Sequence, residues 1–230
     1  MRLSVIIPVY NEVHTVVDVI NAVRNCGVKD LEILVVDDCS TDGTTQLLDS
    51  LPPSPDLRIF HHPVNQGKGA GIRTAQANVT GDVVIIQDAD LEYSPNEFPS
   101  MLKPIADNKA DAVFGSRYSG REILVDSFWH YCGNKFLTFV SNVFSNLHLT
   151  DMETCYKVFR TDVIKKILPT LQQDRFGFEP EITAKVAKAD LRIYEVGISY
   201  FGRTYREGKK IGWKDGFRAI YCILKYGLFG

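Results

Sequence analysis

Val83-Val84-Ile85-Ile86-Gln87-Asp88-Ala89-Asp90-Leu91-Glu92 is a short apolar run that ends abruptly in acidic residues. Its four β-branched residues, with Gly81-Asp82 before them and Ser94-Pro95 after, predict a buried strand of a parallel sheet. The acidic residues then stand at the C-terminal end of this strand. Because ligands of open α/β sheets bind at that edge, the stretch predicts a ligand site as well as a strand.

The carboxylates of this stretch predict a metal site. If the chain stays extended, residues two apart point to the same side, so Asp88, Asp90 and Glu92 share one face. Three like charges repel one another unless a cation lies among them. Mg²⁺ or Mn²⁺ would suit, because hard divalent ions take oxygen ligands and bridge to substrate phosphates. The alternative is that Asp88 and Asp90 only cap the next helix and flank a turn.

Apolar periodicity alternates strands with helices along the whole chain. Strands are predicted at residues 3–9, 31–36, 57–61, 83–86, 111–115, 155–159 and 191–196, and helices at 13–24, 44–51, 65–78, 95–107, 128–147, 162–168, 181–189 and 214–226. Strands and helices that alternate through short links predict an α/β fold with a mostly parallel, doubly wound sheet. The 230 residues, 45% of them hydrophobic, suffice for one sizeable core and hence one domain.

Composition and charge exclude several other classes of protein. The net charge of -2 gives no reason to expect a nucleic-acid partner. The five cysteines lack CxxC spacing, which favours reduced thiols in a cytoplasmic protein over a disulfide framework or a zinc site. The first apolar run is too short for a signal peptide, and no stretch approaches the length of a transmembrane helix.

Three predicted strand ends bring polar residues to one edge of the sheet: Pro8-Val9-Tyr10-Asn11-Glu12, Asp37-Asp38 and Asp88-Ala89-Asp90. Carboxylates beside an extended pocket suit the amide edge of a base and ribose hydroxyls, and a metal held by Asp88 and Asp90 suits a diphosphate. Together they predict a nucleoside-diphosphate ligand. No GxGxxG follows the first strand, so a Rossmann dinucleotide site is not indicated.

The glycine-rich stretch Gly67-Lys68-Gly69-Ala70-Gly71 follows the third predicted strand and lacks the ending of a P-loop. Two interpretations stay open for it. It can serve close packing of a helix on the sheet, with a solvated lysine, or it can lie on the phosphate side of the ligand site.

A further set of segments carries a family resemblance: Val5-Ile6-Ile7-Pro8-Val9-Tyr10-Asn11-Glu12, Val35-Val36-Asp37-Asp38, Gly67-Lys68-Gly69, Asp88-Ala89-Asp90-Leu91-Glu92 and Gly115-Ser116-Arg117-Tyr118. With these segments the chain resembles inverting family 2 glycosyltransferases of the GT-A fold, and within them the dolichyl- and polyprenyl-phosphate mannose or glucose synthases. The resemblance implies one Rossmann-like domain over residues 1–230. In it, residues 1–118 would bind the nucleotide sugar, and residues 119–230 would face the acceptor and end in an amphipathic helix.

The resemblance also implies an activity and a set of residues. The activity is metal-dependent transfer of a hexose from a nucleotide sugar, of the UDP-glucose or GDP-mannose type, to a polyprenyl or dolichyl phosphate. Implied nucleotide-sugar-binding residues are Pro8, Val9, Tyr10, Glu12, Asp37, Asp38, Gly67, Lys68, Asp88 and Ala89. Implied ligands of Mg²⁺ or Mn²⁺ are Asp88, Asp90 and Glu92. The acceptor would displace the diphosphate in one step while the metal stabilises the leaving group, which makes Asp90 catalytic.

On the acceptor side the resemblance assigns cations to a phosphate. Arg117 matches the arginine of the family, and the stretch with Arg203, Arg206, Lys209 and Lys210 resembles a mobile loop that closes over phosphates. The alternative for that stretch is a solvated basic turn. Residues 129–135 lack the arginine that the lipid-phosphate enzymes usually have there; Lys135 can substitute, as a point charge without a bidentate fork.

The acceptor itself stays open at this point. Glu179 falls where family members that act on hydroxyls carry a catalytic base, although an acidic residue also suits the start of a helix. A soluble transferase to a sugar hydroxyl is therefore the alternative, and a nucleotide-sugar-binding module without catalysis is the alternative of another class. The base and sugar of the donor, and homodimer formation, are open as well.

Two apolar helix faces bear on the same question. One is formed by Phe217, Ile220, Tyr221, Leu224 and Leu228, and the other by Phe136, Phe139, Val140, Val143 and Phe144. Either face can dock on the core. The alternative is an interfacial helix that brings a cytoplasmic protein to the cytoplasmic face of a membrane with a lipid acceptor.

Overall fold

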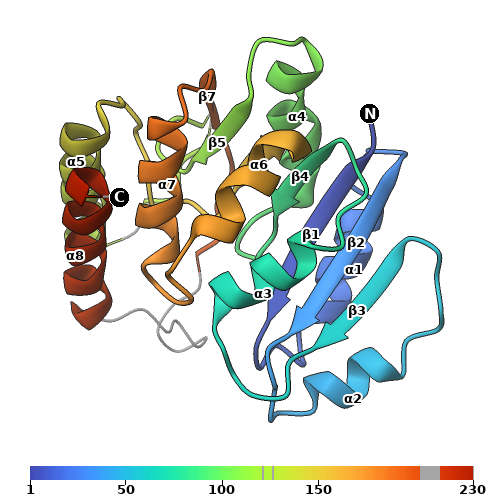
Figure 1. Ribbon diagram of the computed structural model, residues 1–230. Coiled ribbons are helices and arrows are strands. Elements are labelled where there is room, and N and C mark those ends of the chain that lie inside the picture. The colour runs from blue at the N-terminus through green and yellow to red at the C-terminus, as the bar shows by residue number, and fades with distance from the viewer. Residues whose placement is uncertain (121, 126, 203–212, 230) are drawn as a thin grey trace.

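The computed structural model describes residues 1–120, 122–125, 127–202 and 213–229, and a seven-stranded sheet runs through its centre (Figure 1). The strand order is β3-β2-β1-β4-β6-β5-β7. The strands are β1 (Leu3–Val9), β2 (Leu31–Asp37), β3 (Leu57–His61), β4 (Val83–Ile86), β5 (Ala112–Ser116), β6 (Lys157–Arg160) and β7 (Ile193–Gly197). The predicted α/β fold with one mostly parallel sheet is confirmed.

Strand β6 is the exception to the parallel arrangement, since it runs antiparallel to both β4 and β5. The apolar run of residues 155–159 predicted a strand but carried no information about its direction. Because β6 is reversed, it begins at the edge where β4 and β5 end. The segment before it, residues 151–156, therefore reaches the predicted site.

The helices flank the sheet as the periodicity predicted. They are α1 (Val16–Arg24), α2 (Thr44–Asp49), α3 (Lys68–Gln76), α4 (Phe98–Ala106), α5 (Phe128–Ser145), α6 (Thr161–Ile167), α7 (Phe178–Lys188) and α8 (Trp213–Phe229), with 3-10 turns η1 (Pro95–Glu97) and η2 (Leu168–Thr170). Helix α3 packs on β1 and β2, on the face opposite α1, and α5, α7 and α8 lie together at one end of the molecule (Figure 1).

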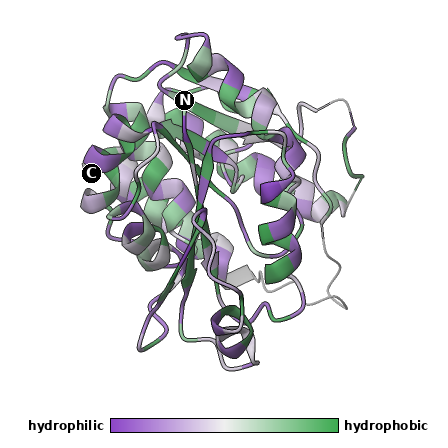
Figure 2. Cartoon of the chain, turned by 90° about the vertical axis from the view of Figure 1, so that its right-hand side faces the viewer, coloured by the Kyte–Doolittle hydropathy of each residue, from purple (hydrophilic) through white to green (hydrophobic). Residues whose placement is uncertain are grey.

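The core is centred on the middle strands. Val83, Val84, Ile85 and Ile86 of β4 are each at most 1% exposed, as expected for a strand that is covered on both faces. Hydrophobic residues concentrate in the strands, while the helices mix hydrophobic and hydrophilic positions (Figure 2). The sheet is thus a rigid platform that holds the loops at its C-terminal edge.

Helices α5 and α8 carry exposed apolar stripes. The α5 stripe is Phe128, Phe136, Phe139 and Val143, and the α8 stripe is Phe217, Tyr221, Leu224 and Leu228. Helix α8 docks on the rest of the protein through its other side, which is formed by Ala219, Cys222, Ile223 and Tyr226. The interpretation that the predicted apolar face of the last helix docks on the core is therefore wrong for the four residues of the α8 stripe. A second apolar side of the same helix makes those contacts instead.

A buried acidic residue, Glu32, anchors the opposite edge of the sheet. Its carboxylate accepts hydrogen bonds from Ser4 Oγ at 2.5 Å, Thr80 N at 2.7 Å and Thr80 Oγ1 at 2.8 Å, and pairs with Arg58 at 2.6 Å. Burial raises the pKa of Glu32, but these hydrogen bonds and the charge of Arg58 outweigh it and lower the pKa to about 2. The ionised carboxylate is therefore strongly favoured by the folded chain.

We expect Glu32 to make the stability depend on pH in the acid range. Its pKa lies below the ordinary 4.5, so the unfolded chain takes up the proton first and the contribution is present above pH 4.5 and lost toward pH 2. The free energy of unfolding, measured with urea at several pH values between 4.5 and 2, should fall less steeply for Glu32→Gln than for the unchanged chain. The exposed Glu122→Gln serves as control. Equal slopes for the unchanged chain and Glu32→Gln would contradict the prediction.

Candidate active site

The C-terminal ends of β1, β2 and β4 bring the predicted donor-side residues together. Asp38 N donates to Val9 O at 2.8 Å, and Thr15 Oγ1 donates to Ala89 O at 2.6 Å. These bonds join the loop after β1 to the loops after β2 and β4. The sequence-based prediction that three strand ends form one edge is confirmed.

The loop after β4 differs from the extended chain that the sequence analysis assumed. Residues 89–92 turn, and Leu91 has φ +60°. Asp90 Oδ1 accepts a hydrogen bond from Glu92 N at 3.2 Å, and Glu92 Oε2 accepts one from Tyr200 Oη at 2.7 Å. The expectation that Asp88, Asp90 and Glu92 share one face of an extended strand is therefore wrong, because the chain leaves the sheet right after Ile86.

Asp88 and Asp90 nevertheless fit a divalent metal. Among the residues described by the structure, no three His, Cys, Asp or Glu side chains converge as a complete ligand set. Mg²⁺, however, is commonly held by one or two carboxylates, with substrate phosphates and water completing its shell. Two carboxylates in the loop that follows β4 at the ligand edge match that donor set, and Asp88 and Asp90 are the residues that would supply it.

Lys68 contacts two carboxylates of this region. Its Nζ lies 2.9 Å from Asp88 Oδ1 and 2.9 Å from Glu179 Oε1. Burial lowers the pKa of Lys68, but the charges of Asp88 and Glu179 outweigh it and hold the pKa well above its ordinary range. The alternative of a solvated lysine is wrong, and Glu179, in the first turn of α7, lies in the same cluster as Asp88.

Asp38 is buried below the ligand edge. Its Oδ1 accepts from Gln66 N at 2.8 Å, its Oδ2 accepts from Gly67 N at 2.6 Å, and His62 Nδ1 lies 2.8 Å from Oδ1. The side chain is 5% exposed. Asp38 thus holds the loop that precedes Lys68, and contact with a nucleoside stays a prediction.

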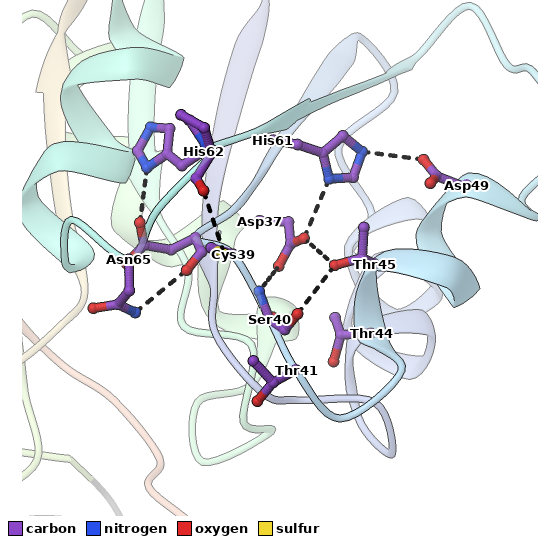
Figure 3. Close-up of polar contacts among 12 residues, drawn as sticks. Asp37, Cys39, Ser40, Thr41, Thr44, Thr45, Asp49, His61, His62 and Asn65 are labelled. Atoms are coloured by element: carbon purple, nitrogen blue, oxygen red, sulfur yellow. Dashed lines mark hydrogen bonds and ion pairs between the residues drawn. The ribbon is translucent and has the colours of Figure 1, made fainter.

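Asp37 organises the neighbouring loop between β2 and α2 (Figure 3). Its carboxylate accepts from Ser40 N at 3.2 Å and from Thr45 Oγ1 at 2.6 Å, and it lies 3.2 Å from His61 Nδ1. Burial raises the pKa of Asp37, but these hydrogen bonds outweigh it and lower the pKa below its ordinary value. Asp37 therefore fixes the conformation of the loop between β2 and α2 at the ligand edge.

The remaining donor-side residues differ in what they expose. Val9 and Ala89 are 1% and 4% exposed, so their side chains pack in the core and only their backbone can meet a ligand. Pro8 lies within β1, opposite Val36. Tyr10 is 42% exposed at the end of β1, and Glu12 accepts from Thr15 Oγ1 at 3.1 Å.

Arg117 is held by Asp151, a residue that the sequence analysis missed. Nε and Nη2 of Arg117 donate to the two carboxylate oxygens at 2.7 and 2.8 Å, and its backbone N donates to Oδ2 at 3.0 Å. The Asp151 side chain is fully buried. Burial lowers the pKa of Arg117, but the surrounding charges, including that of Asp151, raise it well above its ordinary range.

Lys135 lies close to this pair. Its Nζ donates to Thr150 O at 2.9 Å and lies 4.5 Å from the centre of the Tyr118 ring, while Cζ of Arg117 lies 5.7 Å from the same ring. The structure therefore brings both Arg117 and Lys135 to one tyrosine. The other predicted phosphate-binding residues, Arg203, Arg206, Lys209 and Lys210, lie outside the described residues.

Further polar residues below the site were also missed. Burial and the charge of Glu179 raise the pKa of Glu153, while Lys157 is fully buried and donates to Met152 O at 3.1 Å. These residues belong to the segment before β6 and to β6 itself. An apolar strand pattern gives no signal that a lysine on it points into a polar cluster.

Comparison with known proteins agrees with this geometry. The model of glycosyl transferase family 2 matches residues 4–168, which is more than half of the chain. The chain belongs to glycosyl transferase family 2. It is a glycosyltransferase, and its strand-end carboxylates lie within the matched region.

This glycosyltransferase has curated relatives along its whole length. It is 29% identical, over 99% of the chain and 95% of the relative, to an undecaprenyl-phosphate mannosyltransferase of Micrococcus luteus. It is also 29% identical, over 96% of the chain, to the low-salt glycan biosynthesis hexosyltransferase Agl6 of Haloferax volcanii, of which it spans 53%.

Solved structures confirm the GT-A fold of the glycosyltransferase. Glucosyl-3-phosphoglycerate synthase of Mycobacterium tuberculosis, in complex with Mn²⁺, UDP and phosphoglyceric acid, superposes with a TM-score of 0.72 at 18% identity. The match covers 100% of this chain and 79% of that one. Within the described part of the glycosyltransferase, every helix is too short or too polar to cross a membrane.

Proposed function

We propose that this glycosyltransferase transfers a hexose from a nucleotide sugar, of the UDP-glucose or GDP-mannose type, to the phosphate of a polyprenyl phosphate. The choice of acceptor rests on one observation, that the two sides of α5 have different chemical character. Its inward side contributes Lys135 beside Arg117, and its outward side carries the exposed α5 stripe. A phosphate attached to a long apolar chain needs both kinds of surface.

The cations around Tyr118 suit the head of such an acceptor. The Asp151 carboxylate occupies Nε and Nη2 of Arg117, which leaves other N–H groups of the guanidinium for a phosphate. Lys135 adds a second charge at the same ring. Two fixed cations lower the cost of bringing an anionic acceptor next to an anionic donor.

The two stripes suit the lipid part of the acceptor and the bilayer that holds it. Helices α5 and α8 pack against each other, so the α5 stripe and the α8 stripe belong to adjacent helices (Figure 1). Large exposed apolar surfaces of this kind mark interaction sites. An amphipathic helix that lies in the interface buries its apolar side at the level of the lipid headgroups.

The proposed reaction is a single displacement. A phosphate oxygen of the acceptor forms the new bond to the anomeric carbon, while the bond from that carbon to the nucleoside diphosphate breaks and the configuration inverts. Because the acceptor oxygen is already an anion, the reaction needs no strong general base. The metal, when bound at Asp88 and Asp90, neutralises charge that develops on the departing diphosphate.

Transfer to a sugar hydroxyl is the second candidate, and the position of Glu179 favours it. A hydroxyl must lose its proton during attack, and Glu179 provides a carboxylate in the same cluster as Asp88. In this candidate Glu179 accepts the proton of the hydroxyl while its contact with Lys68 holds the carboxylate in place.

A transfer assay separates the two candidates. The purified chain is incubated with UDP-glucose or GDP-mannose, Mn²⁺ and undecaprenyl phosphate in detergent micelles, and the products are identified by mass spectrometry. We expect one donor to yield the hexosyl undecaprenyl phosphate. Transfer to free sugars with no lipid product would support the hydroxyl candidate, and no turnover of any nucleotide sugar would refute both.

We expect substitutions in the stripes to weaken membrane association. Phe139 and Phe217 are 65% and 67% exposed, so Phe139→Ser/Phe217→Ser should leave the fold intact. Burying one phenylalanine contributes roughly 1.5–3 kcal/mol, so the double variant should bind phosphatidylglycerol vesicles at least about tenfold more weakly. Sedimentation with vesicles measures the change.

A matched control uses an apolar residue away from the stripes. Val64, in the loop after β3, is 62% exposed, and Val64→Ser should bind vesicles as well as the unchanged chain does. If the double variant sediments with vesicles as efficiently as Val64→Ser, the stripes do not face a membrane.

A further inference from the structure

Lys68 joins two carboxylates that come from distant parts of the chain. It is the first residue of α3, whereas Asp88 follows β4 and Glu179 lies in the first turn of α7. Its Nζ is within 2.9–3.1 Å of both Asp88 oxygens and 2.9 Å from Glu179 Oε1. The side chains of Lys68, Asp88 and Glu179 are 27%, 24% and 11% exposed, so water screens this contact only in part.

The backbone on either side of Lys68 is pinned. Gly67 N donates to the buried Asp38 carboxylate, and Gly69 N donates to Asp174 O at 2.8 Å. Gly67 has φ +101°, and a Cβ at this position would overlap the carbonyl oxygen of Asp174. With both neighbours fixed, only the side chain of Lys68 can move away from the two carboxylates.

Such a lysine affects any cation that approaches Asp88. The ammonium group already neutralises the carboxylate, and a divalent ion at Asp88 would meet a positive charge at close range. The repulsion is offset only if further negative charge arrives with the ion. A nucleoside diphosphate brings that charge.

We propose that Lys68 is a resident counter-ion of Asp88 and Glu179 that keeps the affinity for free Mn²⁺ low and makes the metal bind together with the nucleoside diphosphate. The inference rests on the proposed function in one respect, since it takes Asp88 as a metal ligand. It goes further by assigning to Lys68 control over the order and strength of metal binding.

The test is a titration of the protein with Mn²⁺ alone, followed by electron paramagnetic resonance of the free ion. Lys68→Met should bind Mn²⁺ at least about tenfold more tightly than the unchanged chain, because the repelling charge is gone. Lys68→Arg keeps the charge and should stay within about twofold of the unchanged chain. In the presence of UDP or GDP, the gain of Lys68→Met should shrink.

Two further variants show where the ion binds. Lys68→Met/Asp88→Asn should lose the gain in Mn²⁺ affinity, because the freed ligand is removed. Lys103→Met removes a lysine that pairs with Asp107 at 3.0 Å but is 72% exposed, and should leave Mn²⁺ binding unchanged. If Lys68→Met does not fold, as judged by circular dichroism, Lys68→Gln keeps a hydrogen-bond donor without the charge and carries the same expectation.

An unchanged or weaker affinity for Mn²⁺ in the folded Lys68 variant without the charge would overturn the inference. A gain that persists in Lys68→Met/Asp88→Asn would overturn it as well, since the ion would then bind elsewhere. The titration uses neither a sugar donor nor a lipid acceptor. A chain that fails to glycosylate polyprenyl phosphate would therefore refute the proposed function while leaving this inference to stand on its own result.

Discussion

Asp90→Ala should lower the rate of hexose transfer at least about a thousandfold, because electrostatic stabilisation of the leaving group commonly contributes most to catalysis of such a reaction. Asp90 lies in the turn after β4 and is partly exposed, and its Oδ1 accepts a hydrogen bond of 3.2 Å from Glu92 N, two residues away in the same turn. Its removal should therefore cost little stability. The measurement is initial-rate kinetics at saturating Mn²⁺, with circular dichroism and thermal unfolding of the same samples.

Asp162→Ala is the matched control for this change. Asp162 is 64% exposed at the start of α6, where it pairs with Arg160 at 3.3 Å. It should retain the full rate of transfer. An Asp90→Ala protein that folds and transfers hexose at the rate of the Asp162→Ala protein would remove Asp90 from the catalytic set.

Asp151→Ala should have the largest effect on stability. It leaves the Arg117 guanidinium, only 13% exposed, without the carboxylate that binds two of its nitrogens. Removing one partner of a buried ion pair typically costs about 3–5 kcal/mol, since a desolvated charge is left uncompensated. For a chain of this size we expect the midpoint of thermal unfolding to fall by roughly 6–20 °C.

The chain contains a well-matched exposed counterpart. Arg192 donates to both oxygens of Asp111 at 2.8 and 3.0 Å, and its backbone N donates to the same carboxylate at 3.0 Å, which repeats the geometry of Arg117 and Asp151. The Arg192 side chain is 51% exposed, so Asp111→Ala should cost at most about 1 kcal/mol. The free energies of unfolding of both variants are measured with urea. Equal losses for Asp151→Ala and Asp111→Ala would show that burial of Arg117 contributes nothing.

Local patterns determined the strands, the helices and the edge at which the ligand site forms. Val83 to Ile86 could be predicted as a buried strand because a run of β-branched residues between turn signals is a property of neighbours in the chain. Parallel strands that all end at one edge then bring the residues after β1, β2 and β4 together. Three of the family motifs lie at these strand ends, and the other two lie at the start of α3 and the end of β5, so the fold and the class of activity followed from the sequence.

The contacts within the site depended on tertiary packing. Arg117 and Asp151 are separated by 34 residues, and Lys68 and Glu179 by 111, so no local pattern relates them. Their meeting depends on the reversed direction of β6 and on the approach of α7 to the start of α3, which periodicity does not encode. The turn at residues 89–92 likewise breaks the extended conformation that would have put Asp88, Asp90 and Glu92 on one face. An apolar pattern specifies which residues are buried, whereas the partner of each buried charge is selected by the order and direction in which the strands assemble.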